Sequence, residues 1–423
     1  MLTRALLSSA TLALAFHAAP ATAQQANDID VLRQQIQQMQ ARLDQMEALQ
    51  RSPAPRALVA GTMESPNAFN PGIGVVLDGR AGYSKADPET YELAGFPLGG
   101  EAAEGPGVRG LRLGEAEVNM FANVDDLFFG NLTVAAHDEG GETEVGLEEA
   151  YVQTLAMPAG LQLTAGKFLS DIGYLNSRHR HEDDFAERPL AYCAILACGF
   201  GDVGARIAWT APADLFLRVG AEVFRGAAFP AAGERHNSTG AHTLFARVGG
   251  DKGALSWQTG LAMLHASASE RETGDGPDTF TGDTDAGIAQ LVLKWTLPGE
   301  RSLAWQTEYL HARIDGTFND IAADRTDDGW YSQLVYRFAP QWATGYRYDR
   351  VGAGGVSPDL ADTALDAQGH KPTRHTVMAQ WAHTEFSRLR LQYAWDRSRA
   401  TQRDHIVQLQ YTVTFGAHPA HEF

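Results

Sequence analysis

The feature that most constrains this chain is a repeated alternation of apolar and polar residues from residue 72 onward. In the last repeat, at 405–416, Val407, Leu409 and Tyr411 share one face, while Gln408 and Gln410 share the other. Successive side chains of a β-strand point to opposite faces, so this segment predicts a strand with one apolar and one wet face. Many such segments, each about ten residues long, are typical of a transmembrane β-barrel.

The segments between turns predict about sixteen strands. We expect them near 72–84, 108–123, 126–137, 144–156, 160–168, 202–211, 214–226, 240–249, 253–268, 285–297, 301–314, 328–339, 341–351, 373–384, 387–399 and 403–415. Short connections, such as 211–213 and 339–340, alternate with long ones at 85–107, 169–201, 227–239, 269–284, 315–327 and 352–372. Outer-membrane barrels alternate short periplasmic turns with long outer loops. The predicted fold class is therefore all-β, an antiparallel transmembrane barrel spanning 71–423.

The first residues predict export. Arg4 precedes an apolar stretch at 5–19, and Ala21-Thr22-Ala23 forms a small-x-small cleavage pattern. We expect a signal peptide at 1–23. No later segment offers about twenty consecutive apolar residues, which excludes a helical membrane protein.

A heptad pattern follows the predicted cleavage site. Its apolar positions are Ile29, Leu32, Ile36, Met39, Leu43 and Met46. Steps of three and four are typical of a coiled coil, and we expect a short periplasmic one at 24–51, followed by a Pro-rich linker at 52–70. Self-association would bury the stripe; a single helix that folds back on the barrel or stays mobile is the alternative.

Two cysteines, Cys193 and Cys198, lie in this exported chain. Thiols outside the cytoplasm tend to oxidise, so a disulfide closing a small loop is expected. The alternative is a pair of metal ligands, although their spacing does not match the common zinc motifs.

The loop at 169–201 carries RHRHEDDF, which gathers imidazole and carboxylate donors. The candidate ligands for zinc or another divalent cation are His179, His181, Glu182, Asp183 and Asp184, with His137 from another loop. The alternative is a solvated loop in which Arg178, Arg180 and Arg188 pair with the acidic residues. Any metal would bind transiently, and no cofactor is required.

Further charged residues are expected to face the lumen. The candidates are Glu115, Glu117 and Glu308, opposed by Arg347, Arg390 and Arg397. Opposed charges would set a transverse field across the pore. In the periplasmic tail, His418 and His421 could hand metal onward or be incidental.

The charge balance predicts the ion preference. Lys and Arg number 34 against 52 Asp and Glu, a net charge of -18, and the acidic residues concentrate in the long loops. An acidic mouth raises the local cation concentration, which predicts a cation-preferring pore. Alternatively, these acidic residues bind divalent ions that bridge lipopolysaccharide, or they keep the surface soluble.

The AGKFLSDIGYLN segment at 165–176, the GYRYDR strand and the aromatic C-terminal residue resemble the phosphate-selective porin O and P superfamily. GKFLSDIGYLNSRHRHEDDF and FGAHPAHEF resemble a subgroup often labelled zinc-regulated, TonB-dependent outer-membrane receptor. The resemblance implies sixteen strands, a homotrimer and an inward-folded loop. The acidic balance departs from the Lys and Arg clusters of phosphate selectivity, and the roughly fifty residues before the barrel are too few for the plug of a gated receptor.

Together these features predict an outer-membrane channel of a Gram-negative bacterium for passive diffusion of small hydrophilic solutes, including zinc or other divalent cations. Its expected partners are outer-membrane lipid, lipopolysaccharide and further copies of itself; no nucleic acid is expected. No serine-nucleophile or metal-hydrolase motif is present, so an enzyme is not expected. An anion or phosphate porin and a non-conducting anchor tethered by the coiled coil are the alternatives.

Overall fold

The computed structural model describes residues 71–98, 105, 107, 109–139, 142–233, 239–273 and 278–417. The predicted signal peptide at 1–23, coiled coil at 24–51 and linker at 52–70 lie outside these residues, as do His418 and His421.

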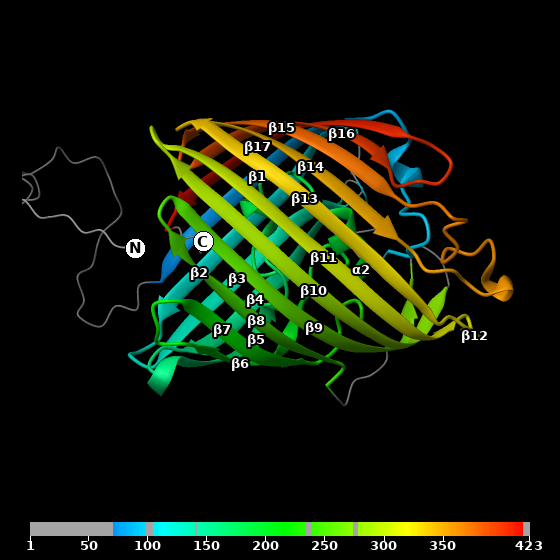
Figure 1. The fold of residues 1–423 in the computed structure, drawn as a ribbon, viewed down its shortest axis with the longest axis horizontal. Helices are drawn as coiled ribbons and strands as arrows, with labels where there is room; N and C mark the ends of the chain where they lie inside the picture. The colour runs from blue at the N-terminus through cyan, green and yellow to red at the C-terminus, as the bar shows by residue number, and fades with distance from the viewer. Residues whose placement is uncertain are drawn as a thin grey trace, which may run out of the picture. The chain divides into compact units, whose positions relative to one another are not determined.

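Among the described residues, sixteen long strands form one closed antiparallel barrel (Figure 1). They are β1 (Gly72–Ser84), β2 (Gly110–Asn123), β3 (Phe128–Glu139), β4 (Glu142–Thr154), β5 (Leu161–Leu169), β6 (Gly201–Thr210), β7 (Phe216–Phe224), β8 (Ala241–Lys252), β9 (Leu255–Glu272), β10 (Thr279–Leu297), β11 (Arg301–Phe318), β13 (Arg325–Ala339), β14 (Trp342–Gly352), β15 (Thr373–Thr384), β16 (Ser387–Arg397) and β17 (Asp404–Gly416). The two-residue β12 (Ile321–Ala322) pairs with β11. The barrel closes because β17 pairs with β1, from Gly74 opposite Gly416 to Ser84 opposite Ile406.

The helical elements are short. They are η1 (Pro88–Thr90), η3 (Pro158–Gly160), η4 (Arg180–Glu182), η5 (Pro358–Leu360) and α2 (Leu190–Leu196). No helix in the described part of the chain combines the length and apolar character needed to cross a membrane.

The predicted antiparallel barrel of about sixteen strands is confirmed. The predicted long loops at 269–284 and 315–327 are the main correction, because much of both segments continues the strands. Backbone pairing runs from Leu297 opposite Arg301 out to Phe280 opposite Phe318, across polar residues that the sequence pattern predicts to be loop. A strand continues wherever its backbone forms hydrogen bonds with a neighbouring strand, whatever its side chains are. β10 and β11 therefore extend beyond the residues whose apolar side chains face lipid.

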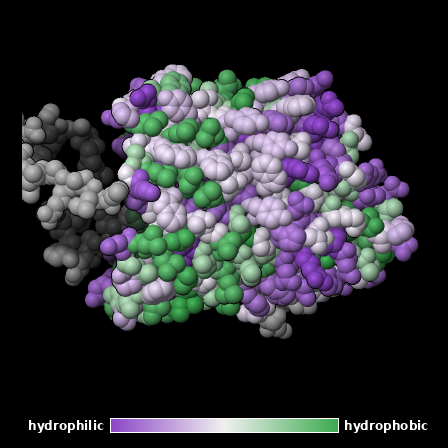
Figure 2. Space-filling model, viewed as in Figure 1, coloured by the Kyte–Doolittle hydropathy of each residue, from purple (hydrophilic) through white to green (hydrophobic). Residues whose placement is uncertain are grey.

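The outer wall of the barrel is apolar. Leu244, Leu261 and Met263 point outward with 60%, 69% and 69% of their surfaces exposed. Figure 2 shows hydrophobic residues over much of the wall and hydrophilic residues gathered at the end where Figure 1 places β12. Water-soluble monomers do not expose so much apolar surface, whereas a lipid-facing wall must. We therefore treat the strands as membrane-spanning.

The interior of the barrel is occupied by residues 170–200, which we call the inward loop. Its helix α2 packs against β11, β13 and β14. Ile172, Leu190, Tyr192 and Phe200 from this loop are completely or almost completely buried. Cys193 and Cys198 form a disulfide across the end of α2. The core of the molecule thus lies between the inward loop and the barrel wall.

Candidate functional site

Glu308 of β11 anchors the inward loop by accepting four hydrogen bonds. The backbone N–H groups of Tyr174 and Leu175 donate at 2.6 and 3.3 Å. The hydroxyls of Tyr192 and Tyr331 donate at 2.9 and 2.5 Å. Glu308 is only 1% exposed. A buried carboxylate needs such partners, so this residue serves the loop and is not a free charge in the lumen.

A second anchor holds the start of the inward loop. The carboxylate of Asp171 lies 3.1 Å from Arg218, 3.3 Å from Arg247 and 3.8 Å from Arg206. Its backbone N–H donates to Glu222 of β7 at 3.0 Å. Burial alone would raise the pKa of Asp171, but the charges of Arg247, Arg206 and Arg218 hold it well below its usual range. Asp171 is therefore ionised at neutral pH and neutralises part of this basic cluster.

Arginines of β14 and β16 hold the backbone of the same loop. Arg347 of β14 donates to the carbonyl of Glu187 at 2.8 Å, and Arg390 of β16 donates to the carbonyl of Asp183 at 2.6 Å. Both arginines are almost fully buried. Carbonyl acceptors at several points fix the path of the loop across the lumen.

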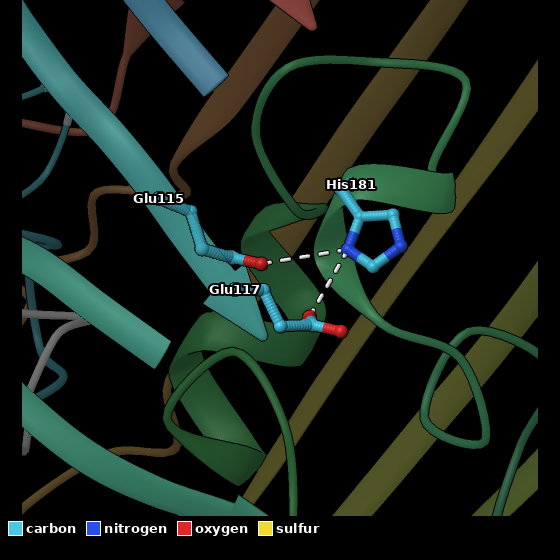
Figure 3. A group of neighbouring side chains, drawn as sticks. All are labelled: Glu115, Glu117 and His181. Atoms are coloured by element: carbon cyan, nitrogen blue, oxygen red, sulfur yellow. Dashed lines mark hydrogen bonds and ion pairs between the residues drawn. The ribbon is translucent and has the colours of Figure 1, made fainter. Parts of the chain in front are cut away.

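The other side of the loop faces a row of carboxylates on β2 and β4. His179 immediately precedes η4, and His181 is its second residue. Their rings stack with centroids 5.7 Å apart. Nδ1 of His181 lies 3.4 Å from Oε1 of Glu115 and 3.3 Å from Oε2 of Glu117 (Figure 3). Positions 115 and 117 share the inner face of β2, as the period of a strand requires.

His179 faces three carboxylates. Its Nδ1 lies 3.4 Å from Oε2 of Glu117 and 3.2 Å from Oε2 of Glu148, and its Nε2 lies 3.1 Å from Oε2 of Glu149. Adjacent strand residues normally point to opposite faces. A bulge between β3 and β4 shifts the register here, because Thr133 pairs with Glu149 while Val134 pairs with Leu147. The extra residue lets both glutamates reach the lumen.

We call these six residues the histidine–glutamate cluster: His179, His181, Glu115, Glu117, Glu148 and Glu149. Burial alone would lower the pKa of His181, but a hydrogen bond with Glu115 and the negative charges of Glu117 and Glu115 raise it to about 9. The pKa of His179 is likewise raised well above its usual value, since Glu148, Glu149 and Glu117 outweigh the effect of burial. Without a bound cation, both imidazoles are therefore protonated at neutral pH.

The cluster separates two hollows in the lumen. A cavity of about 690 Å³ extends toward the short-turn end, with Glu117, His179 and His181 among its lining residues. A second pocket of about 100 Å³ is lined by charged residues that include Glu115 and Arg180. The cluster contributes to the walls of both, so its charged side chains lie between the two hollows.

The structure divides the residues that the sequence grouped as metal ligands. His179 and His181 enter the cluster, and Nε2 of His137 lies 3.5 Å from Oε1 of Glu148. Glu182 lines the larger cavity.

The remaining two carboxylates point elsewhere. Asp183 pairs with Arg188 at 2.9 Å, and Asp184 accepts a hydrogen bond from Gln333 of β13 at 3.2 Å. They separate from the imidazoles because the chain leaves η4 toward β13 and β16. Glu148 and Glu149, which the sequence analysis missed, take their place; the consecutive pair in GLEEAYVQ was the available signal.

Five of the six predicted lumen residues face the barrel interior, namely Glu115, Glu117, Glu308, Arg347 and Arg390. Arg397 does not. Alternate residues of β16, among them Arg390, Gln392 and Asp396, are buried in the interior. Arg397 is an odd-numbered position of this strand and therefore lies on the outer face. Its assignment to the lumen therefore requires correction.

A closed sixteen-stranded barrel with a lipid-facing wall and an inward loop is the architecture of outer-membrane porins. Comparison with solved structures agrees on the fold. The outer membrane channel DcaP of Acinetobacter baumannii matches 82% of this chain and 97% of its own, with a TM-score of 0.52 and 12% identity. An anion-selective porin from Comamonas acidovorans matches 82% of this chain and 99% of its own, with a TM-score of 0.50 and 11% identity.

The sequence is also similar to an uncharacterized protein of Aquifex aeolicus (strain VF5). The two are 31% identical over 394 residues, which cover 85% of this chain and 81% of the Aquifex protein. The chain belongs to the same family as that protein. No family model matches the sequence. The resemblance to the phosphate-selective superfamily and its zinc-regulated subgroup stays a prediction.

Proposed function

We propose that this protein is an outer-membrane channel for passive diffusion of small hydrophilic solutes, with its N-terminus in the periplasm. The observation that carries the proposal is the narrowed polar interior. A cavity of about 690 Å³ and a charged pocket meet at the histidine–glutamate cluster, inside a wall that is apolar on its outside. A wet lumen within a lipid-facing barrel is the arrangement that water-filled pores require.

The constriction has opposed charges. Glutamates of β2 and β4 lie on one side of the inward loop, and Arg388 and Arg390 of β16 donate to loop carbonyls from another side. Such an arrangement orients small dipolar solutes and excludes bulky apolar ones. We infer selection for small, charged or strongly polar solutes.

The long-loop end supports a preference for cations. Its exposed carboxylates include Asp320, Asp324, Asp328, Asp359 and Asp362. Asp327, by contrast, is buried against Arg325 at 2.9 Å and adds little to the field. An acidic entrance raises the local concentration of cations, including divalent ones.

One observation favours the second candidate, an anion-preferring pore. The pocket of about 100 Å³ is lined by Arg80, Arg112, Arg180, Arg188 and Arg374 as well as by carboxylates. If these arginines govern permeation, the pore would prefer anions despite its acidic mouth.

Planar-bilayer recording of the purified full-length protein tests the proposal. Stepwise conductance that increases in proportion to salt concentration is expected of a pore, with a reversal potential in a KCl gradient that indicates K⁺ preference. A Cl⁻ preference would overturn the acidic-mouth argument and support the second candidate. Membranes that stay silent at high protein density would overturn the channel and favour an anchor. We further propose a homotrimer surrounded by lipid and lipopolysaccharide, which native mass spectrometry would test.

A further inference from the structure

One carboxylate oxygen in the constriction lacks a hydrogen bond. Oε2 of Glu117 is buried, and the residue is only 3% exposed. This oxygen points at two imidazole nitrogens, Nδ1 of His181 at 3.3 Å and Nδ1 of His179 at 3.4 Å. It is within ion-pair distance of both nitrogens but forms a hydrogen bond with neither, whereas buried carboxylate oxygens normally accept one.

The separations are within ion-pair range but longer than those of charge-assisted hydrogen bonds. Hydrogen bonds between a charged nitrogen and a carboxylate are usually about 2.7–2.9 Å. In a tetrahedral zinc site with bonds of about 2.0–2.1 Å, neighbouring ligand atoms lie about 3.4 Å apart. The distances from Glu117 to both imidazoles, and the 3.4 Å from Glu115 to His181, are close to this second value. The 3.2 Å from His179 to Glu148 and the 3.1 Å from His179 to Glu149 lie between the two values.

The donors form two overlapping sets of three. Glu115, Glu117 and His181 form one set, and Glu117, Glu148 and His179 form the other; within each, the ligand atoms lie within 4.8 Å of one another. Imidazole and carboxylate together suit divalent transition metals better than calcium or magnesium, which prefer oxygen ligands. Because both sets contain Glu117, they could be two alternative sites for one ion or two neighbouring sites that each hold an ion.

The ligands come from both sides of the passage. His179 and His181 belong to the inward loop, whereas the glutamates belong to the wall strands β2 and β4. A bound ion would therefore link the loop directly to the wall between the two hollows of the lumen. It would also offset the negative charge of several adjacent carboxylates.

We propose that the histidine–glutamate cluster binds a divalent transition metal ion such as Zn²⁺, and that the bound ion closes the passage by tying the inward loop to β2 and β4. An ion held by three protein donors that join the loop to the wall leaves more slowly than a freely diffusing one, so binding reduces conductance. The effect on conductance rests on the proposed channel function, whereas metal binding does not.

Two measurements separate these parts. Binding is measured on tag-free protein in detergent from the visible absorption of added Co²⁺, followed by its displacement with Zn²⁺. Conductance is measured in planar bilayers, first with EDTA and then with micromolar Zn²⁺. Failure of the channel function would appear as silence in EDTA, whereas failure of the metal site would appear as an absent Co²⁺ spectrum.

The informative variants are Glu117→Gln and His181→Ala. Removing a direct ligand should weaken binding by at least about tenfold, since even the groups that support ligands contribute about 10–100-fold. Glu117→Gln removes the ligand that both sets share and should lose the Zn²⁺ block while conducting in EDTA. His181→Ala removes only one set and should weaken the block, and His179→Ala together with His181→Ala should abolish it. The matched control is His265→Ala, because His265 faces outward and pairs with Asp285 at 2.8 Å, away from the lumen.

Resistance of the inward loop to trypsin shows whether each variant keeps its fold. His181→Gln provides a further test, because its loop should remain resistant to trypsin. If this variant also loses the Co²⁺ spectrum, the imidazole itself is the ligand, which supports the proposal. Unchanged Co²⁺ binding in Glu117→Gln and His181→Ala would overturn the site. Zn²⁺ binding that leaves wild-type conductance unchanged would overturn closure of the passage.

Discussion

Replacement of Glu308 by Gln tests whether this residue anchors the inward loop. The carboxylate accepts from two backbone N–H groups and from the hydroxyls of Tyr192 and Tyr331. The glutamine amide keeps one acceptor oxygen, so about two of the four donors lose their partner. Each hydrogen bond to a charged group contributes about 1.5–3 kcal/mol. The loop should therefore open more easily by about 3–6 kcal/mol, which is at least a hundredfold increase in the open population.

Trypsin measures this opening directly, because Arg178, Arg180 and Arg188 lie in the inward loop. When opening and closing are fast, the cleavage rate follows the open population. Folded Glu308→Gln protein should be cut at these arginines at least about a hundredfold faster than wild type, with the fragments identified by mass spectrometry. Glu385→Gln, in an exposed turn, is the control for charge removal. If Glu308→Gln is cut in the loop no faster than this control, the anchoring argument is wrong.

Three further predictions concern the same loop. Gly173→Ala should raise tryptic cleavage toward the level of Glu308→Gln, because Gly173 has φ +72° and an added Cβ would lie 2.3 Å from the hydroxyl of Tyr192 and 2.7 Å from Oε1 of Glu308. Asp171→Asn should weaken hydrogen-exchange protection of the loop by about 3–5 kcal/mol at neutral pH, since it leaves a buried arginine cluster with less neutralising charge. The folded pKa of Asp171 lies below the unfolded value of about 3.9, so its contribution is present above that pH, and the difference from wild type should shrink as pH falls below about 4. Reducing the disulfide at Cys198 should lower the free energy of loop opening by about 2 kcal/mol, measured by the same exchange; an unchanged rate would show that α2 packing alone holds this turn.

The sequence by itself was enough to determine the barrel. Alternation such as that from Val407 to Phe415 predicts which residues face lipid. The positions and lengths of the turns predict where the strands reverse direction. Both signals are local, because the strand period acts within a few residues. The ends of β10 and β11 were missed because pairing with a neighbour extended strands through polar residues.

The tertiary structure decided the site. The sequence identified His179 and His181, but their partners lie 30 to 66 residues away on β2 and β4. Glu148 and Glu149 face the lumen together only because a bulge breaks the local period, and Asp183 turns away to meet Arg188. Closing a sheet brings distant strands around one space, and the packing of the loop inside that space selects which side chains meet. No local pattern in the sequence contains that information.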